Sequence, residues 1–248
     1  MSWVYFESMG RLLKQKGNSK MNETAVILLS GGLDSSVLLH YIIKKLNYKT
    51  IFALSFNYGQ KHNKELEMAE SQISGLPEIK ERKIIDISFF SDLIDGSCSL
   101  TTGGAEIPKL SDLSETQKNQ PSTYVPNRNM ILLSLAAAYA EAKMCPTVFY
   151  GAQAQDEYGY WDCTTEFLEQ INAVFSLNRK QKIKIEAPFV KLKKFEEVKI
   201  GAELGVNFFN TWSCYRGEEK HCGLCPTCVE RKNAFVQACI KDPTIYAV

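Results

Sequence analysis

The amino-acid sequence predicts an α/β domain in which helices cover both faces of a twisted parallel sheet. Short apolar runs alternate with stretches of helical period, and a glycine-rich turn separates the first apolar run from the first helical stretch. Strands buried on both faces are continuously apolar, and strand–helix alternation is typical of the crossovers that join parallel strands. This combination predicts a doubly covered parallel sheet.

The expected elements are derived from these patterns in order. Residues 25–29 (AVILL) form a short apolar run, and residues 35–46 repeat apolar side chains at a helical period. The same criteria predict strands at 50–56, 83–87 and 147–151, and helices through 65–69 and over 131–142. Residues 97–124 are rich in small and polar side chains, and we expect them to form a lid-like loop over the functional site.

The expected elements divide the chain into three parts. Residues 1–20 differ in pattern from the rest of the chain and form an N-terminal extension of uncertain role, either a separate extension or a short amphipathic helix packed on the body. Residues 21–205 form the α/β body, and residues 206–248 form a cysteine-rich segment packed on it. A chain of 248 residues can bury a full core without disulfides.

The composition excludes several classes of protein. The net charge of +1 gives no basis for direct nucleic-acid binding or for attachment to an anionic membrane. No apolar run approaches the roughly 18 residues that a membrane span needs, and the start lacks the pattern of a signal peptide. Half of the eight cysteines lie within a short C-terminal stretch, which suits a metal site in a reducing, cytoplasmic setting.

Residues 30–36 (SGGLDSS) come directly after the first strand and open the first helix, which predicts an anion site. Two glycines let the backbone approach a phosphate, and the helix N-terminus presents free N–H groups to it. The loop is neither a Walker A loop nor a dinucleotide fingerprint. Asp34 needs a compensating charge beside a polyphosphate, and Mg²⁺ is the expected source. The alternative is a plain glycine turn before a serine-capped helix.

Four cysteines at tight spacing predict a metal centre near the C-terminus: Cys214, Cys222, Cys225 and Cys228. Four thiolates with no open position are typical of a structural Zn²⁺ site. A redox C-x-x-C pair, unrelated thiols and an iron–sulfur cluster remain alternatives. His221 adjoins the cysteines, but a fourth cysteine makes it redundant as a ligand. We expect Arg231 and the helix after Cys228 to pack this segment against the body.

Together these motifs resemble known enzymes. The 30–36 loop is similar to the SGG-x-DS loop of the PP-loop ATP pyrophosphatases. From residue 24 to the end the chain resembles the QueC family of 7-cyano-7-deazaguanine (preQ0) synthases, which act in queuosine biosynthesis. The further segments that carry the resemblance are 56–62 (FNYGQKH), 124–129 (YVPNRN), 159–163 (GYWDC) and 242–244 (DPT).

The resemblance implies a Rossmann-like fold of the adenine nucleotide alpha hydrolase type and a ligase that forms C–N bonds. The substrates would be ATP, ammonia and 7-carboxy-7-deazaguanine, and the product the nitrile 7-cyano-7-deazaguanine, formed through an adenylated carboxylate and an amide. It also implies structural Zn²⁺, Mg²⁺ and a homodimer. Members grip the ATP with the loop and its flanks, which here are Leu28, Leu29, Ser30, Gly31, Gly32, Leu33, Asp34, Ser35, Ser36, Val37 and Leu38.

Four residues are the expected catalytic groups: Asp34, Ser35, Arg128 and Asp162. Arg128 would neutralise phosphate charge, with an ordinary ion pair as the alternative. Asp162 would accept hydrogen bonds from the guanine-like edge of the substrate, with turn capping as the alternative. Cys163 is expected to pack.

Two histidines have plainer interpretations. For His62 the options are a proton carrier, a cap or an exposed side chain, and His40 is expected to be structural.

Three positions depart from the family pattern and bear on the acceptor: Asn57, Asn127 and Trp161. The first competing function is a paralogue acting on a related deazapurine or another acceptor, as in DNA modification or defence. The others are a PP-loop tRNA thiolase and a zinc-stabilised binding module without turnover.

Overall fold

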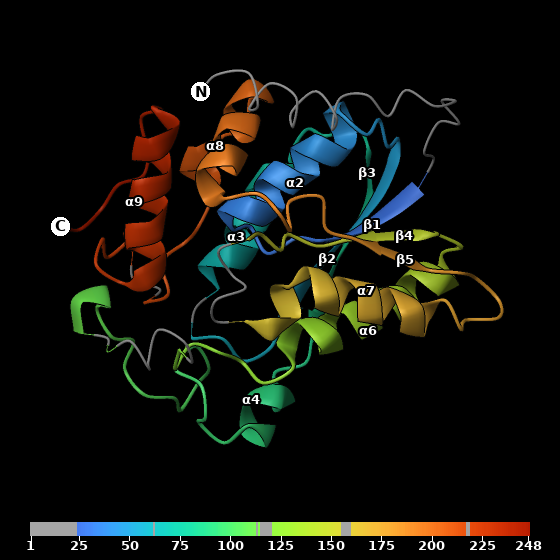
Figure 1. Ribbon diagram of the computed structural model, residues 1–248, viewed down its shortest axis with the longest axis horizontal. Helices are drawn as coiled ribbons and strands as arrows, with labels where there is room; N and C mark the ends of the chain where they lie inside the picture. Colours follow the sequence, from blue (N-terminus) through green and yellow to red (C-terminus); the bar gives the residue numbers. More distant parts are fainter. Residues whose placement is uncertain (1–23, 62, 113, 115–120, 155–159, 217–218) are drawn as a thin grey trace.

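The computed structural model describes residues 24–61, 63–112, 114, 121–154, 160–216 and 219–248. The predicted extension 1–20 and His62 lie outside these residues. Five parallel strands form one sheet in the order β3-β2-β1-β4-β5 (Figure 1). Their bounds are β1 (Thr24–Leu28), β2 (Thr50–Asn57), β3 (Ile79–Asp86), β4 (Thr147–Phe149) and β5 (Lys184–Glu186).

Helices cover both faces of this sheet, as predicted. Figure 1 shows α2, α8 and α9 on one side of the sheet and α6 and α7 on the other. The bounds are α2 (Leu33–Lys44), α3 (Lys64–Ile73), α4 (Phe89–Leu93), α6 (Arg128–Ala142), α7 (Thr165–Phe175), α8 (Lys194–Glu203) and α9 (Pro226–Ala238). Within the described part of the chain no helix is long and apolar enough to cross a bilayer.

Side chains alternate between the two faces of the sheet along each strand, so each face of the sheet has its own hydrophobic core. In β1, Ala25 and Ile27 pack with α2 and α9 on one face, while Val26 packs with α6 and α7 on the other. All three side chains are fully buried. The continuous apolar run therefore reflects burial on both faces, the expected property of an internal parallel strand.

The observed bounds differ from the predicted ones by a few residues, and the largest shift is at the start of β3. β3 begins at Ile79, four residues before the predicted strand, because it is an edge strand whose Lys and Glu side chains face solvent. Lys143, next to the end of α6, bonds to one of them, Glu81, at 2.7 Å. Four elements were not predicted: α4, α7, β5 and α8. β5 spans three residues with a charged residue at each end, which leaves no apolar run to recognise.

The cysteine-rich segment shares the main core. Phe235 of α9 meets Phe208 edge to face, with ring centroids 5.0 Å apart. Arg231 is buried and donates to the Thr211 hydroxyl at 2.7 Å, to the Phe208 carbonyl at 2.9 Å and to Asp242 at 3.3 Å. These partners all lie within 206–248, so Arg231 holds this segment together internally. The last helix packs on the body as predicted, because Ala234, Phe235 and Ala238 share one core cluster with Ile27 and Leu38.

Candidate active site and metal centre

The 30–36 loop lies where the strand order reverses. β1 and β4 are neighbours in the sheet, and the chain leaves them in opposite directions. Gly151, just after β4, is so close to α2 that a Cβ there would lie 3.2 Å from the Ser35 nitrogen. In open α/β sheets ligands bind in the crevice outside the carboxyl ends of the strands at such a switch point. The predicted anion loop therefore occupies the expected position for a ligand site.

Hydrogen bonds within the loop hold it around the start of α2. The Ser30 and Ser35 hydroxyls are 3.0 Å apart, and Ser36 donates to the Gly32 carbonyl at 2.7 Å. Gly32 is the N-cap of α2, and no side chain caps the helix, so the serine cap of the alternative interpretation is absent. The first N–H groups of the helix have no side-chain cap, which is the arrangement an anion requires.

Gly31 allows α3 to pack against this loop. Its φ is +86°, and a Cβ there would lie 2.1 Å from the Glu65 carbonyl oxygen and 2.5 Å from the Ala69 nitrogen. The Gly31 carbonyl also accepts from the Trp212 N–H at 2.9 Å. Three segments that are distant in sequence thus meet at one residue that tolerates no side chain.

The loop opens into a cavity of about 740 Å³. Such a volume accommodates a nucleotide-sized ligand. Of the eleven residues assigned to ATP, seven line the cavity: Leu28, Leu29, Ser30, Gly32, Leu33, Asp34 and Ser35. Val37 and Leu38 have fully buried side chains in the core, so they support the loop from beneath instead of reaching the cavity.

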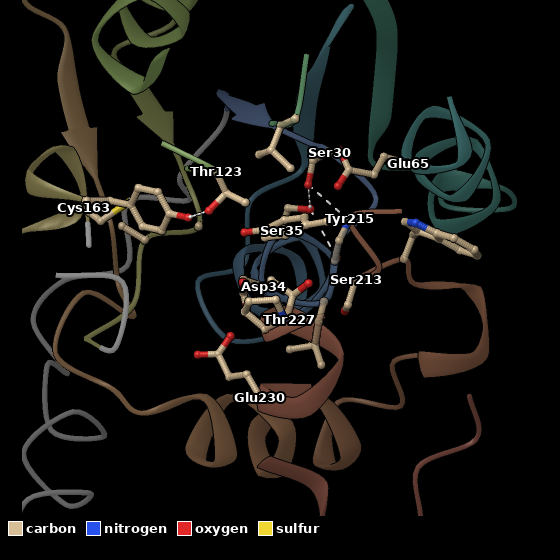
Figure 2. Close-up of a pocket in the computed structure, with 18 of the residues that line it drawn as sticks. Ser30, Asp34, Ser35, Glu65, Thr123, Cys163, Ser213, Tyr215, Thr227 and Glu230 are labelled. Carbon is tan, nitrogen blue, oxygen red and sulfur yellow. Dashed lines mark hydrogen bonds between the residues drawn. The ribbon is translucent and has the colours of Figure 1, made fainter. Parts of the chain in front are cut away.

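A buried lysine supplies the charge that Asp34 needs. The Lys194 Nζ lies 3.5 Å from an Asp34 oxygen and 2.8 Å from a Glu230 oxygen, and Lys194 is 8% exposed. Figure 2 shows Asp34 and Glu230 on the same side of the cavity. Mg²⁺ beside Asp34 stays a prediction, and Lys194 from α8 is a positive charge near Asp34 that the sequence did not reveal. The second Asp34 oxygen, Oδ1, is buried without a hydrogen-bond partner among the described residues.

Arg128, Tyr58 and Glu65 form another part of the cavity wall. Arg128 is the first residue of α6, and its guanidinium lies over the Tyr58 ring, 6.0 Å from the centroid. Burial raises the pKa of Tyr58 to about 12. Burial also raises the pKa of Glu65 to about 7, although the positive charge of Arg128 acts in the opposite direction. Arg128 therefore brings a permanent positive charge to the cavity.

Asp162 is buried beside the cavity wall. Its Oδ2 accepts from the Asn129 backbone N–H, at 3.1 Å, in the first turn of α6. Burial raises the pKa of Asp162, and the charge of Arg128 partly offsets this. Asp162 does not line the cavity in the described part of the chain. The predicted contact with a guanine edge stays a prediction, and this geometry supports the capping alternative.

The other singled-out side chains have structural surroundings. Cys163 accepts from the Asn129 side-chain amide at 3.3 Å and packs in the core below α6 and α7. His40 is buried within α2, where burial lowers its pKa. Both fit the expected packing roles, although Cys163 also reaches the cavity wall (Figure 2).

The three departures from the family pattern lie outside the cavity lining in the described part of the chain. Asn57 bonds Asp86 at 3.2 Å and the Gly59 N–H at 3.3 Å, and so shapes a turn. Trp161 is 44% exposed and donates to the Tyr124 hydroxyl at 2.6 Å. Asn127 has φ of 54°, a left-handed conformation that explains why glycine suits this position. Among the described residues, none of the three belongs to the cavity lining that a substrate would touch.

The described part of the lid-like loop forms one wall of the cavity. The wall includes Leu100, Pro108, Leu110, Pro121, Ser122 and Thr123. Lys61 donates to the Gly104 and Ala105 carbonyls at 2.9 and 2.8 Å, and Thr123 bonds the Tyr160 hydroxyl at 2.8 Å (Figure 2). The loop is therefore attached both to the turn after β2 and to the segment after β4. That it opens and closes stays a prediction.

The four predicted cysteines form a buried cluster. Their sulfur atoms all lie within 4.8 Å of one another, and Cys222 and Cys228 are 4.0 Å apart. A tetrahedral ion with metal–sulfur bonds of about 2.3 Å holds its sulfurs about 3.8 Å apart, so the spacing fits a single metal ion. Backbone N–H groups donate to the Cys214 and Cys222 sulfurs at 3.3 Å, which favours thiolates.

His221 stands outside this cluster, as expected. Its Nε2 accepts from the Ser213 backbone N–H at 3.0 Å, so one ring nitrogen is already engaged in the protein. Burial lowers the pKa of His221 to about 4, and the side chain is neutral at physiological pH. It holds the segment before Cys214 in place.

Sequence reasoning missed several residues of the cavity wall. Lys194 lies in a lysine-rich stretch that is typical of a solvated surface, and Glu65 in a helix with many charges. The inner face of α9 contributes Thr227, Glu230, Asn233, Ala234 and Gln237. A helix was expected after Cys228, whereas α9 begins at Pro226. No local signal indicated that it faces the cavity.

The strand order, the loop at the switch point and the cavity define a doubly wound phosphate-binding protein of the PP-loop type. The model of the family described as "Queuosine biosynthesis protein QueC" matches residues 24–239. The chain belongs to the QueC family.

Several relatives carry one name. The 7-cyano-7-deazaguanine synthase of Caldicellulosiruptor saccharolyticus is 46% identical over 224 residues, covering 90% of this chain and 96% of that protein. The 7-cyano-7-deazaguanine synthase of Archaeoglobus fulgidus is 43% identical over 222 residues, covering 89% of each. Among solved structures, NMN synthetase from Francisella tularensis is similar, with a TM-score of 0.49, 18% identity and coverage of 98% of this chain and 88% of that one.

Proposed function

We propose that this protein is a 7-cyano-7-deazaguanine synthase that converts 7-carboxy-7-deazaguanine and ammonia to the nitrile at the expense of ATP. The observation that carries the proposal is the family match over 24–239 combined with a nucleotide-sized cavity built on the 30–36 loop. The departures at Asn57, Asn127 and Trp161 leave the described wall of this cavity unchanged.

Some residues of the cavity bind the substrates, and others stabilise the charge that develops during the reaction. The Ser30–Ser35 pair and the N-terminus of α2 hold the pyrophosphate of ATP. Lys194 and Arg128 supply positive charge as the pyrophosphate leaves and AMP joins the substrate carboxylate. Tyr58 and Tyr160 offer aromatic surface for a planar heterocycle. Ammonia then displaces AMP to give the amide, and a second ATP activates the amide oxygen for elimination.

Two metal ions belong to this proposal. The four cysteines would hold Zn²⁺ as a structural ion, since their spacing fits a single tetrahedral centre better than a multinuclear cluster. Asp34 would bind Mg²⁺ through its unpartnered Oδ1, together with phosphate oxygens of ATP. Mg²⁺ supplies neutralisation of phosphate charge when it is bound.

The proposal is tested by incubating the protein with ATP, Mg²⁺, ammonium and 7-carboxy-7-deazaguanine and identifying the products by mass spectrometry. We expect the nitrile together with AMP and pyrophosphate. Absence of both amide and nitrile with folded, zinc-loaded protein would refute the assignment. Nitrile formation from a different deazapurine only would point to the paralogue alternative.

Replacing Lys194 with methionine is expected to weaken ATP binding. The change leaves Asp34 and Glu230 without their shared positive charge beside a polyphosphate, and charged hydrogen bonds contribute about 1.5–3 kcal/mol. We expect the KM for ATP to rise about tenfold to a hundredfold. The control is Lys191→Met, an exposed lysine of the same stretch. An unchanged KM in a folded Lys194→Met protein would contradict the assigned role.

The tRNA thiolase alternative lacks support in the cavity. That chemistry expects a pair of catalytic cysteines, and Cys163 is the sole cysteine lining the cavity among the described residues.

A homodimer and a cytoplasmic location are proposed together with the function. Gel filtration with light scattering tests whether the protein is a homodimer.

A further inference from the structure

Glu65 is an acidic side chain in the cavity wall, beside the loop that is expected to bind phosphate. It lies in the first turn of α3, and its backbone oxygen occupies the space that a Gly31 side chain would need. Figure 2 shows its side chain directed toward Ser30 of the phosphate loop. Glu65 is therefore fixed next to the phosphate loop, and a permanently charged carboxylate there would repel ATP.

The surroundings of Glu65 differ from those of Asp34. Asp34 has the ammonium group of Lys194 at 3.5 Å. Within the described part of the chain, no ion pair or hydrogen bond reaches the Glu65 carboxylate. Among the described residues, the charged and titratable groups that act on it are Arg128 from α6 and Tyr58 after β2. On its own helix, Lys64 is engaged with Glu67 at 3.7 Å.

This environment makes Glu65 able to change its charge near neutral pH. Burial raises its pKa to about 7, against the opposing effect of Arg128. The most effective proton acceptor is one whose pKa lies near the working pH. Of the acidic side chains in the cavity wall, Glu65 combines that property with a place beside the phosphate loop.

We propose that Glu65 is the catalytic base that receives the protons of the nitrogen substrate. The proposal rests on the proposed function. The Glu65 carboxylate binds ammonium and takes one proton, and the nitrogen lone pair then attacks the carbonyl carbon of the acyl adenylate. A C–N bond forms and the C–O bond to AMP breaks, with its electron pair leaving on AMP. The adduct loses its second N–H proton to the carboxylate, which has meanwhile released the first to water.

The same group serves the second half of the reaction. The amide nitrogen carries two protons. As the amide oxygen attacks the α-phosphorus of the second ATP and pyrophosphate leaves, the nitrogen gives up its first N–H proton to the Glu65 carboxylate, which passes it to water. The second N–H proton must then be removed for the nitrile to form. The Glu65 carboxylate accepts that proton, the N–H electron pair becomes the third C–N bond, and the C–O bond to AMP breaks. One base beside the phosphate loop is sufficient because both activated oxygens are bonded to the α-phosphate of ATP.

The test compares Glu65→Gln with the wild type in three reactions. Substrate-dependent exchange of pyrophosphate into ATP, without ammonium, measures adenylation alone and is expected to stay within a few-fold of wild type. Formation of amide and nitrile from ammonium at pH 7 is expected to fall by about 100-fold or more. Trapping of the acyl adenylate by hydroxylamine, a nucleophile that is largely unprotonated at neutral pH, is expected to be retained.

The pH dependence gives a second readout. The wild-type rate with ammonium is expected to rise as the pH passes through about 7 and Glu65 ionises. Because the folded-state pKa of Glu65 is raised, its contribution to stability is present at low pH and is lost as the pH rises through about 7. The melting temperature of Glu65→Gln should therefore exceed that of the wild type at pH 8 and approach it near pH 5.

Glu67→Gln is the matched control, since Glu67 is an exposed carboxylate of the same helix and should change none of these readouts. Loss of exchange in Glu65→Gln would overturn the proposal and make Glu65 a binding residue. Equal losses with ammonium and hydroxylamine, or no loss with ammonium, would also overturn it. If the wild type itself shows no substrate-dependent exchange, the proposed function fails and the role of Glu65 fails with it.

Discussion

Removal of the metal from the four-cysteine centre is expected to abolish ATP-dependent activity, although no ligand cysteine lines the cavity in the described part of the chain. The reason is that residues next to the cysteines in the sequence line the cavity. Ser213 and Tyr215 flank Cys214, Thr227 lies between Cys225 and Cys228, and Glu230 is two residues beyond, and all four line the cavity (Figure 2). A metal held by the four cysteines would therefore fix the parts of the wall that α9 and the segment around Cys214 provide.

The expected loss is large because such sites stabilise folding directly. Structural Zn²⁺ binding contributes about 10–16 kcal/mol in apparent terms in small zinc domains, more than the whole stability of many domains. We expect Cys228→Ala, or treatment with a strong chelator, to lower kcat/KM by at least about 100-fold and to expose the amides of α9 to hydrogen exchange, because the first turn of α9 loses its anchor.

The control for the metal experiment is Cys239→Ala, an exposed cysteine at the end of α9 and outside the cluster. It should keep one bound metal per chain, measured by elemental analysis, and full activity. Metal-free protein that retains both ATP binding and protection of α9 would show that the ion is dispensable for the cavity.

Gly31→Ala is expected to disable the phosphate loop. The new methyl group would overlap the Glu65 carbonyl and the Ala69 nitrogen, at 2.1 and 2.5 Å, and a φ of +86° is unfavourable for alanine. The start of α3 must move away or the loop must change shape. Displacements of about 1 Å can cost about 100-fold in rate, so we expect kcat/KM for ATP to fall by about that factor or more.

A second glycine separates backbone strain from the clash. Gly75 has a φ of +78°, but a Cβ there would meet nothing within 4 Å, and it lies at the far end of α3. Gly75→Ala should cost about 1–2 kcal/mol of stability by its backbone conformation and leave the KM for ATP unchanged. Equal effects of the two substitutions on ATP kinetics would show that strain, and not the packing of α3 on the loop, governs the site.

Local patterns in the sequence were sufficient to predict several strands, the anion loop and the cysteine centre. The apolar runs predicted β1, β2 and β4, because burial on both faces of a sheet requires them. The Gly-Gly turn predicted the anion loop, since positive φ and the start of a helix are encoded within a few residues. The spacing of the four cysteines predicted the metal centre for the same reason.

The tertiary structure alone decided what surrounds the loop. Lys194 meets Asp34 across 160 positions of the chain, Trp212 bonds Gly31 across 181, and Glu65 acquires its raised pKa by burial beside Arg128. Neither the hydrophobic periodicity nor the spacing of motifs in the sequence predicts these long-range contacts. The sequence by itself determined the fold class, the phosphate loop and the cysteine ligands because their physics is local. The charged side chains and the wall of the cavity depend on which distant segments pack together. That packing depends on how the whole chain buries its shared core.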